Sequence, residues 1–587
     1  MSHAAFEHFR QRLTRIYSST DHSAQQIHGI SERLLARCQQ FAETQGKEIT
    51  APPESCDKQR WSQDDVILIA YGDSIRKADA SESPLVTLKK FLIQQLSGTV
   101  NSVHILPFFP FSSDDGFSVI DYRQVNPDLG DWQDIRDIAE QFDLMADLVI
   151  NHCSRENLWF IDFIGNRPPY DQYFIESDPT LDLSAVTRPR NTPLLSPVHT
   201  HEGIKHVWAT FSEDQIDLNF ANPEVLLEFV DIFLMYLEQG ARFIRLDAIA
   251  FLWKQIGTAC LHLPQTHEVV KLLRDILDFF APDVVLITET NVPVKENLSY
   301  FGASDEAHMV YQFGLPPLVL HALNRGNASF LTDWALTIPK LPTGCTYLNF
   351  TASHDGIGVR PVEGILPERE VQDLIDCMHR FGGFVSMKAN SDGTESPYEI
   401  NITLFDACMG TRRGVDHFQV PRFICSQAIM LAMQGIPAVY IHSLTATPND
   451  LAHVEQTGRT RSINRKIWDE EELLLLLNNP VTPQAEVFTE LRRMISIRRQ
   501  QLAFHPQARQ QVIKINSDLF IIKRTACDKS QFIYAISNVT ERILKLPLAS
   551  LGFLPHGLQD LLRPQSDVID HELLLAPYQS VWLAEVS

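Results

Sequence analysis

The sequence has few basic residues for its length, and it lacks any long apolar run. Lysine and arginine number 50 against 73 aspartates and glutamates, which gives a formal net charge of −23 at pH 7. A nucleic-acid-binding protein needs a basic face, so this balance argues against that class. No stretch approaches the ~18 apolar residues of a membrane helix, and no cationic segment followed by an apolar run opens the chain. We therefore expect a cytoplasmic protein with neither nucleic acid nor membrane as partner.

The cysteines lack the spacing of a metal site. The nine contain no CxxC pair, which disfavours a cysteine-type zinc site, and their odd number fits reduced thiols. Hydrophobic residues make up 44% and charged residues 21%, an ordinary globular composition that excludes a disordered or fibrous chain. A chain of 587 residues is long enough for three or four domains, or for one large barrel with insertions.

Short, continuous apolar runs alternate with helical patterns through most of the chain. Runs of this kind are typical of strands buried on both faces. One intervening helix is marked by Asn222 as its cap and Pro223 in its first turn, and Gly240 follows its end. Eight such runs predict a (β/α)8 TIM barrel, and periodicity leaves a doubly wound sheet open as the alternative. The runs are residues 66–71, 102–106, 144–150, 242–246, 284–287, 309–313, 347–351 and 438–441.

Other segments divide the chain around this α/β barrel. Residues 1–60 contain two amphipathic helical patterns, and a polar, proline-containing stretch at 50–63 is predicted as a linker. Strand-like alternation at 512–515, 519–523, 532–537 and 580–583 predicts a C-terminal β-sandwich. We expect a helical N-terminal extension (1–60), barrel segments (61–154, 221–355 and 423–508), an irregular inserted domain (155–220), a second insertion (356–422) and a C-terminal β domain (509–587).

Polar residues that could carry chemistry follow four of the apolar runs. In a TIM barrel, the C-terminal ends of the strands meet on one face. The residues are Asn151 and His152, Arg245 and Asp247, Glu289, and His354 and Asp355. A single aspartate after a strand is more often a helix cap or turn residue, but several carboxylates in this order are more specific. A charged carboxylate beside a protonated one suits displacement at a glycosidic bond with retention.

These four segments resemble the four regions that characterise the α-amylase family of glycosidases. The resemblance extends from about residue 67 to the end of the chain. Within that family the chain is most similar to the sucrose phosphorylase-like branch. The stretches that carry this likeness are residues 109–122, 257–260, 315–323, 354–358 and 461–465. The resemblance implies double displacement through a glucosyl-enzyme, without a cofactor.

The resemblance also implies a role for each matching residue. Asp247 would be the nucleophile, Glu289 the general acid and then base, and Asp355 the residue that holds the glucosyl 2- and 3-hydroxyls. Asp147 would pack beneath the site without touching substrate. Asn151 occupies the place of a calcium ligand in some amylases, but one amide makes no calcium site, and we expect no metal. Residues expected around the glucosyl ring are Asp114, Phe117, His152, Phe211, Gln215, Arg245, His354 and Arg461.

Two of these assignments have a physical basis of their own. Arg245 lies two residues before Asp247, so both side chains point to one side of the strand, and a nearby cation lowers the pKa of a carboxylate. Burial without a paired cation would instead raise the pKa of Glu289. For Phe211, simple core packing is the alternative.

The acceptor side departs from the sucrose phosphorylase pattern. Around Tyr398, Ser396 replaces an aspartate and Glu399 a glutamine. Phe251 and Asn291 likewise stand where sucrose phosphorylases have a tyrosine and a histidine. Together with Arg412 and Arg413 and the helical extension, these departures look more like the glucosylglycerate phosphorylases of the branch. A solvated turn is the alternative for the two arginines.

A phosphorylase also needs a place for phosphate. Arg188 and Arg190 match the arginine-bearing loop of the branch, and a guanidinium donates two parallel hydrogen bonds to phosphate or carboxylate. The resemblance thus implies an enzyme that converts 2-O-α-glucosylglycerate and phosphate into α-glucose 1-phosphate and glycerate.

Several alternatives stay open. They are phosphorylases of sucrose, sucrose 6′-phosphate or glucosylglycerol, a hydrolase or transglucosidase, and a non-catalytic amylase-like interaction protein. Asp247, Glu289 and Asp355 are all present, which disfavours the last. The sequence leaves open the role of residues 1–60 and the oligomeric state, for which a homodimer is one alternative.

Overall fold

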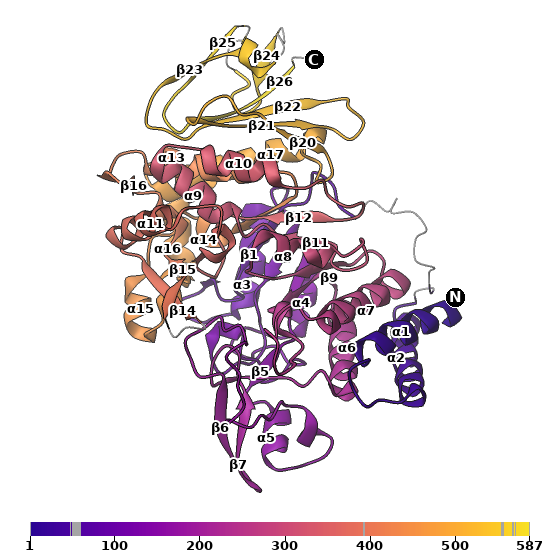
Figure 1. The fold of residues 1–587 in the computed structure, drawn as a ribbon. Coiled ribbons are helices and arrows are strands. Elements are labelled where there is room, and N and C mark those ends of the chain that lie inside the picture. The colour runs from indigo at the N-terminus through magenta and orange to yellow at the C-terminus, as the bar shows by residue number, and fades with distance from the viewer. Residues whose placement is uncertain are drawn as a thin grey trace.

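A closed barrel of eight parallel strands forms the centre of the computed structural model, which describes residues 2–46, 49, 60–390, 394–552, 557–565, 569 and 571–585 (Figure 1). Each predicted apolar run supplies one barrel strand, so the TIM barrel is confirmed. The strands are β1 (Ile67–Ala70), β3 (Ser102–Ile105), β4 (Asp143–Val149), β9 (Ala241–Asp247), β10 (Val285–Thr288), β11 (Met309–Tyr311), β12 (Thr346–Asn349) and β18 (Ile436–Tyr440).

Helices surround this barrel. The helix predicted after Asn222 is α6 (Pro223–Glu238), and the Asn222 side chain accepts a hydrogen bond from the Glu224 backbone, as a cap does. The others include α3 (Pro84–Phe91), α4 (Trp132–Ala139), α7 (Pro264–Phe280), α8 (Val294–Leu298), α9 (Leu315–Arg325), α10 (Ser329–Thr337), α13 (Gln419–Ala432), α14 (Ile441–Leu444), α15 (Leu451–Thr457), α16 (Glu470–Leu477) and α17 (Pro483–Arg499). Within the described residues, no helix is both long and apolar enough to cross a bilayer.

The two helices predicted near the N-terminus are α1 (Ser2–Ile16) and α2 (Ala24–Thr44), which lie against α7 and α6 (Figure 1). Phe9 of α1 is fully buried and stacks on Phe280, with ring centroids 6.3 Å apart. Arg12 donates to Asp275 across 2.9 Å, so this contact is both apolar and ionic. Most of the predicted linker at 50–63 lies outside the described residues.

The first insertion is more regular than the sequence predicts. It contains α5 (Leu158–Ile164) and an antiparallel hairpin of β6 (Leu195–Thr200) and β7 (Gly203–Trp208). The hairpin projects from the end of the molecule opposite the C-terminal sheet (Figure 1). Pro197 and the polar residues of this segment hide its strand pattern. Two short strands, β5 (His152–Ser154) and β8 (Gln215–Asp217), pair where the insertion leaves and rejoins the barrel.

The second insertion forms a three-stranded sheet in the order β13 (Ile357–Gly358), β15 (Glu395–Asn401), β14 (Phe384–Ala389). Helix α11 (Glu368–Arg380) precedes β14, and α12 (Leu404–Ala407) follows β15. A tight hairpin of β16 (Gly410–Thr411) and β17 (Gly414–Val415) ends the segment.

The C-terminal segment is a two-layer β structure. One layer has five strands in the order β20 (Arg509–Val512), β21 (Leu519–Thr525), β22 (Phe532–Asn538), β26 (Ser580–Glu585), β24 (Leu558–Asp560), and the other pairs β23 (Leu544–Pro547) with β25 (Glu572–Leu575). A separate apolar core lies between the layers. The strand predicted at 512–515 lies earlier in the chain, at Arg509–Val512. We keep the segment bounds predicted from the sequence as our proposed division into domains.

Candidate active site

One pocket gathers most of the predicted site residues at the C-terminal ends of the barrel strands. The predicted residues that line it are Asp114, Phe117, His152, Arg190, Phe211, Gln215, Arg245, Asp247, Glu289, His354, Asp355, Tyr398 and Arg461. Phe251 and Asn291 line it as well. Glu399, Arg188, Arg412 and Arg413 do not.

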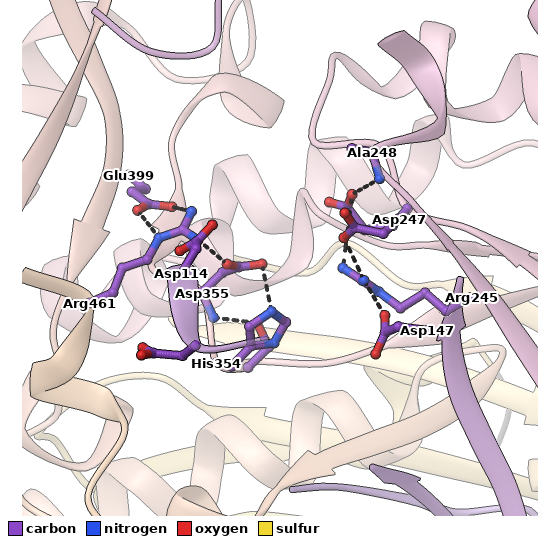
Figure 2. Close-up of polar contacts among 12 residues, drawn as sticks. Asp114, Asp147, Arg245, Asp247, Ala248, His354, Asp355, Glu399 and Arg461 are labelled. Carbon is purple, nitrogen blue, oxygen red and sulfur yellow. Dashed lines mark hydrogen bonds and ion pairs between the residues drawn. The ribbon is translucent and has the colours of Figure 1, made fainter. Parts of the chain in front are cut away.

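Arg245 on β9 organises the floor of this pocket (Figure 2). Its Nη1 contacts Asp147 of β4 and donates to Asp247 Oδ1 across 2.7 Å, and its Nη2 lies 3.9 Å from Glu289 Oε2. Asp147 is fully buried beneath the pocket, 2.6 Å from His104 Nε2. Burial raises the pKa of Asp147, but His104 and Arg245 outweigh it and lower the value to about 2. Asp147 is therefore a fixed anion that holds Arg245.

The carboxyl groups of Asp247 and Glu289 are both buried near Arg245, at different distances from its guanidinium. Burial raises the pKa of Glu289 to about 7, against the opposing charge of Arg245. Burial also raises the pKa of Asp247 and outweighs the opposing effect of its contact with Arg245, so the lowered pKa expected from the sequence is not found. The guanidinium is closer to Asp247 than to Glu289, which favours negative charge on Asp247 and the proton on Glu289. The pair can thus supply one charged and one protonated carboxyl, as glycosidic displacement requires.

The backbone after β9 adopts an unusual conformation. Ala248 has φ 50°, a left-handed conformation that is costly for a residue with a side chain. In this conformation its N–H donates to Glu289 Oε2 across 3.1 Å. Asp114, on the opposite wall, has φ 54°. Such strained residues concentrate at functional sites, where the surrounding structure holds them.

The opposite wall of the pocket carries a second charged cluster. Arg461 Nη1 lies 2.6 Å from Asp355 Oδ1, and His354 Nε2 lies 3.5 Å from Asp355 Oδ2 (Figure 2). Burial raises the pKa of Asp355, yet the positive charge of Arg461 overcomes this effect and holds it well below the usual value. Burial keeps the pKa of His354 low, so its ring is neutral. Phe117 stacks on that ring with centroids 4.9 Å apart.

Glu399 does not line the pocket, although the sequence analysis placed it on the acceptor side. Successive side chains of a strand point to opposite faces, and Tyr398, its neighbour on β15, takes the pocket side. Glu399 is buried and accepts two hydrogen bonds from Arg461, at 2.7 and 2.8 Å (Figure 2). Arg190 Nη1 lies 4.0 Å from the same carboxylate. The guanidinium of Arg461 is therefore shared between Glu399 and Asp355.

The structure separates the arginines that the sequence grouped. Arg190 lines the pocket with its guanidinium 5.5 Å from the centroid of the Tyr398 ring. Arg188, two residues earlier, lines a different cavity. Arg412 and Arg413 lie at the turn between β16 and β17, in a third cavity that the C-terminal domain borders. Arg413 is exposed and contacts Glu541 of that domain, so the structure does not bring this hairpin turn to the pocket.

The ammonium group of Lys254 lies beside Asn151, the residue that matches a calcium ligand of some amylases. Lys254 Nζ donates to Asn151 Oδ1 across 2.7 Å and to the Phe251 carbonyl across 2.5 Å. It also lies 2.6 Å from Asp217 Oδ2. Its side chain is only 4% exposed, so the oxygens that converge there hold an ammonium group. Within the described residues, no group of three or more histidines, cysteines or carboxylates is arranged to hold a metal ion.

The sequence analysis did not predict the position of Lys254 or the ion pairs of Asp115. Lys254 ends an apolar segment, residues 248–253, and an isolated cation after such a run was the available signal. Asp115 contacts Arg465 and lies 3.1 Å from Arg459 Nη1. No local pattern points to that pairing, because the partners are some 350 residues apart in the chain.

Comparisons with known proteins agree on the family. A family model for the catalytic domain of alpha-amylase matches residues 92–356. The chain is 46% identical to the glucosylglycerate phosphorylase of Escherichia coli (strain K12) over 90% of this chain and 93% of that protein. It is 48% identical to the glucosylglycerate phosphorylase of Spirochaeta thermophila, over 81% of this chain and 80% of that protein.

The fold has a matching crystal structure. Sucrose 6F-phosphate phosphorylase from Thermoanaerobacter thermosaccharolyticum is 26% identical to this chain and has a TM-score of 0.70. The match covers 81% of this chain and 94% of that one. Most of the fold of this chain is therefore shared with a phosphorylase of known structure.

Proposed function

The chain belongs to the α-amylase family, in the branch of the sucrose and glucosylglycerate phosphorylases, and from this premise we propose that it is a retaining glucosylglycerate phosphorylase. It converts 2-O-α-glucosylglycerate and phosphate into α-glucose 1-phosphate and glycerate. The observation that carries the proposal is the position of Arg190, a cation in the same pocket as the Asp247 and Glu289 carboxyls. Both acceptors in this reaction, phosphate and glycerate, are anions that a guanidinium binds well.

In the first half-reaction, Asp247 attacks the anomeric carbon and Glu289 donates its proton to the leaving glycerate oxygen. Arg245 keeps negative charge on Asp247, and the raised pKa of Glu289 keeps its proton available at neutral pH. Asp355 binds glucosyl hydroxyls, and Arg461 holds it in the charged form. Phe117, His152, Phe211, Gln215, His354 and Asp114 surround the glucosyl ring.

In the second half-reaction, phosphate replaces glycerate and attacks the glucosyl-enzyme. The Arg190 guanidinium lies 5.5 Å from the centroid of the Tyr398 ring, and we assign both residues to the acceptor side, where they hold the phosphate and, in the reverse direction, the glycerate carboxylate. Glu289 is then the base that takes the proton of the incoming acceptor. The reaction needs no cofactor. We propose that the enzyme is cytoplasmic and acts on the sugar and inorganic phosphate.

Product analysis tests this assignment. The enzyme is incubated with α-glucose 1-phosphate and one acceptor at a time, namely glycerate, glycerol, fructose or fructose 6-phosphate, and released phosphate is measured. We expect glycerate to give the fastest release. Preference for a neutral acceptor would refute the glycerate assignment. Formation of free glucose and glycerate from glucosylglycerate at high phosphate, with no α-glucose 1-phosphate, would identify a hydrolase instead of a phosphorylase.

A further inference from the structure

A second basic cavity lies beside the catalytic pocket, and the proposed reaction does not use it. It has a volume of about 500 Å³ and is lined by Arg188, Arg360 and Lys388, together with residues 183–187, Leu194 and Asn390. None of its described lining residues is acidic. Three cations therefore converge on this cavity in a chain whose net charge is −23.

The two arginines of this cavity lack an anionic partner. Both are half-buried, and among the described residues neither Arg188 nor Arg360 makes a salt bridge. Arg360 Nε is buried and without a hydrogen-bond acceptor in the structure. Lys388 has a partner, since its Nζ lies 3.1 Å from Glu363 Oε1. Two half-buried guanidiniums without a carboxylate partner at one cavity offer their N–H groups to an anion.

The cavity joins the segments that form the acceptor side. Arg188 lies on the loop of the first insertion that carries Arg190 into the catalytic pocket. Arg360 follows β13, which pairs with β15, the strand of Tyr398 and Glu399. Lys388 lies on β14, opposite Ser396 of β15. An anion held by all three cations would therefore tie the Arg190 loop to the sheet that presents Tyr398.

We propose that this cavity is a second anion site that binds a phosphate group and, when occupied, fixes the loop that presents Arg190. Two guanidiniums and an ammonium suit the oxygens of a phosphate dianion, which accepts several charge-assisted hydrogen bonds. The phosphate group can belong to inorganic phosphate or to a phosphate monoester. The effect on Arg190 rests on the proposed function, whereas anion binding by the cavity does not.

Titration calorimetry with inorganic phosphate tests the site directly. The wild type is compared with Arg360→Gln, with Lys388→Gln as a second variant and with Arg369→Gln as control, because Arg369 is exposed and lines neither pocket. We expect the first two variants to bind phosphate about 10- to 100-fold more weakly at this site, and the control to bind like the wild type. Competition by α-glucose 1-phosphate and by 3-phosphoglycerate then identifies whether a monoester is the preferred source.

Kinetics test the link to Arg190. We expect Arg360→Gln to need several-fold more phosphate for half-maximal phosphorolysis, with an unchanged rate of glucosyl transfer to water. Phosphate affinity equal to that of the wild type in both Arg360→Gln and Lys388→Gln would overturn the site. If those variants lose phosphate binding while the wild type gives only free glucose, the anion site stands and the proposed function fails.

Discussion

Replacement of Lys254 by methionine should destabilise the junction between the barrel and the first insertion. Lys254 joins Asn151 after β4, Phe251 after β9 and Asp217 on β8. Methionine retains the length of the stem but removes the ammonium. Asp217 is fully buried and would keep only the hydrogen bonds from Thr210 and Asn151.

The expected loss is large because one charge of a buried pair is left without its partner. Removing one member of such a pair costs about 3–5 kcal/mol. Amide hydrogen exchange in β5 and β8 measures this cost locally, and 3–5 kcal/mol corresponds to exchange that is faster by a factor of about 10² to 10³ or more. The double variant Lys254→Met/Asp217→Asn removes both charges and should recover part of the protection. Lys295→Met, on an exposed position of α8, is the matched control.

Two results would refute this reasoning. Exchange in β5 and β8 within twofold of the wild type in Lys254→Met would mean that the ammonium is not required there. Equal exchange in the single and double variants would mean that the unpaired charge of Asp217 is not the cause.

Three further predictions concern the reaction. Asp247→Asn should abolish turnover in a folded enzyme, because an amide forms no glucosyl ester, and appreciable phosphorolysis by the pure variant would remove Asp247 from that role. Since burial raises the pKa of Glu289 to about 7 and its protonated form is the acid, glucosylation by glucosylglycerate should fall about tenfold per pH unit above pH 7. With glucosyl fluoride, whose leaving group needs no proton, the rate should not fall above pH 7. A fall in rate that begins near pH 4.5 with glucosylglycerate would contradict the raised pKa of Glu289. Arg190→Gln should raise the KM for phosphate about tenfold or more while hydrolysis stays unchanged, and an unchanged KM would place phosphate elsewhere.

The sequence alone predicted the barrel and most of the residues that line the pocket. A parallel strand buried on both faces must be a continuous apolar run, so eight such runs identify the eight strands. The polar residues after them meet because a barrel brings the C-terminal ends of all its strands to one face. The positions of Asp247, Glu289 and Asp355 at or after the ends of three different strands therefore predicted that the three carboxyl groups lie close together.

Only the tertiary structure decided which charges pair. Glu399 and Tyr398 are adjacent in sequence, yet strand alternation turns one toward Arg461 and the other toward the pocket. Arg188 and Arg190 separate into two cavities, and Arg413 reaches a glutamate of the C-terminal domain. Apolar periodicity reports burial, which is a local property of the chain. Ion pairing depends on distances of a few ångströms between segments that are remote in sequence, and these distances exist only after the insertions have folded against the barrel.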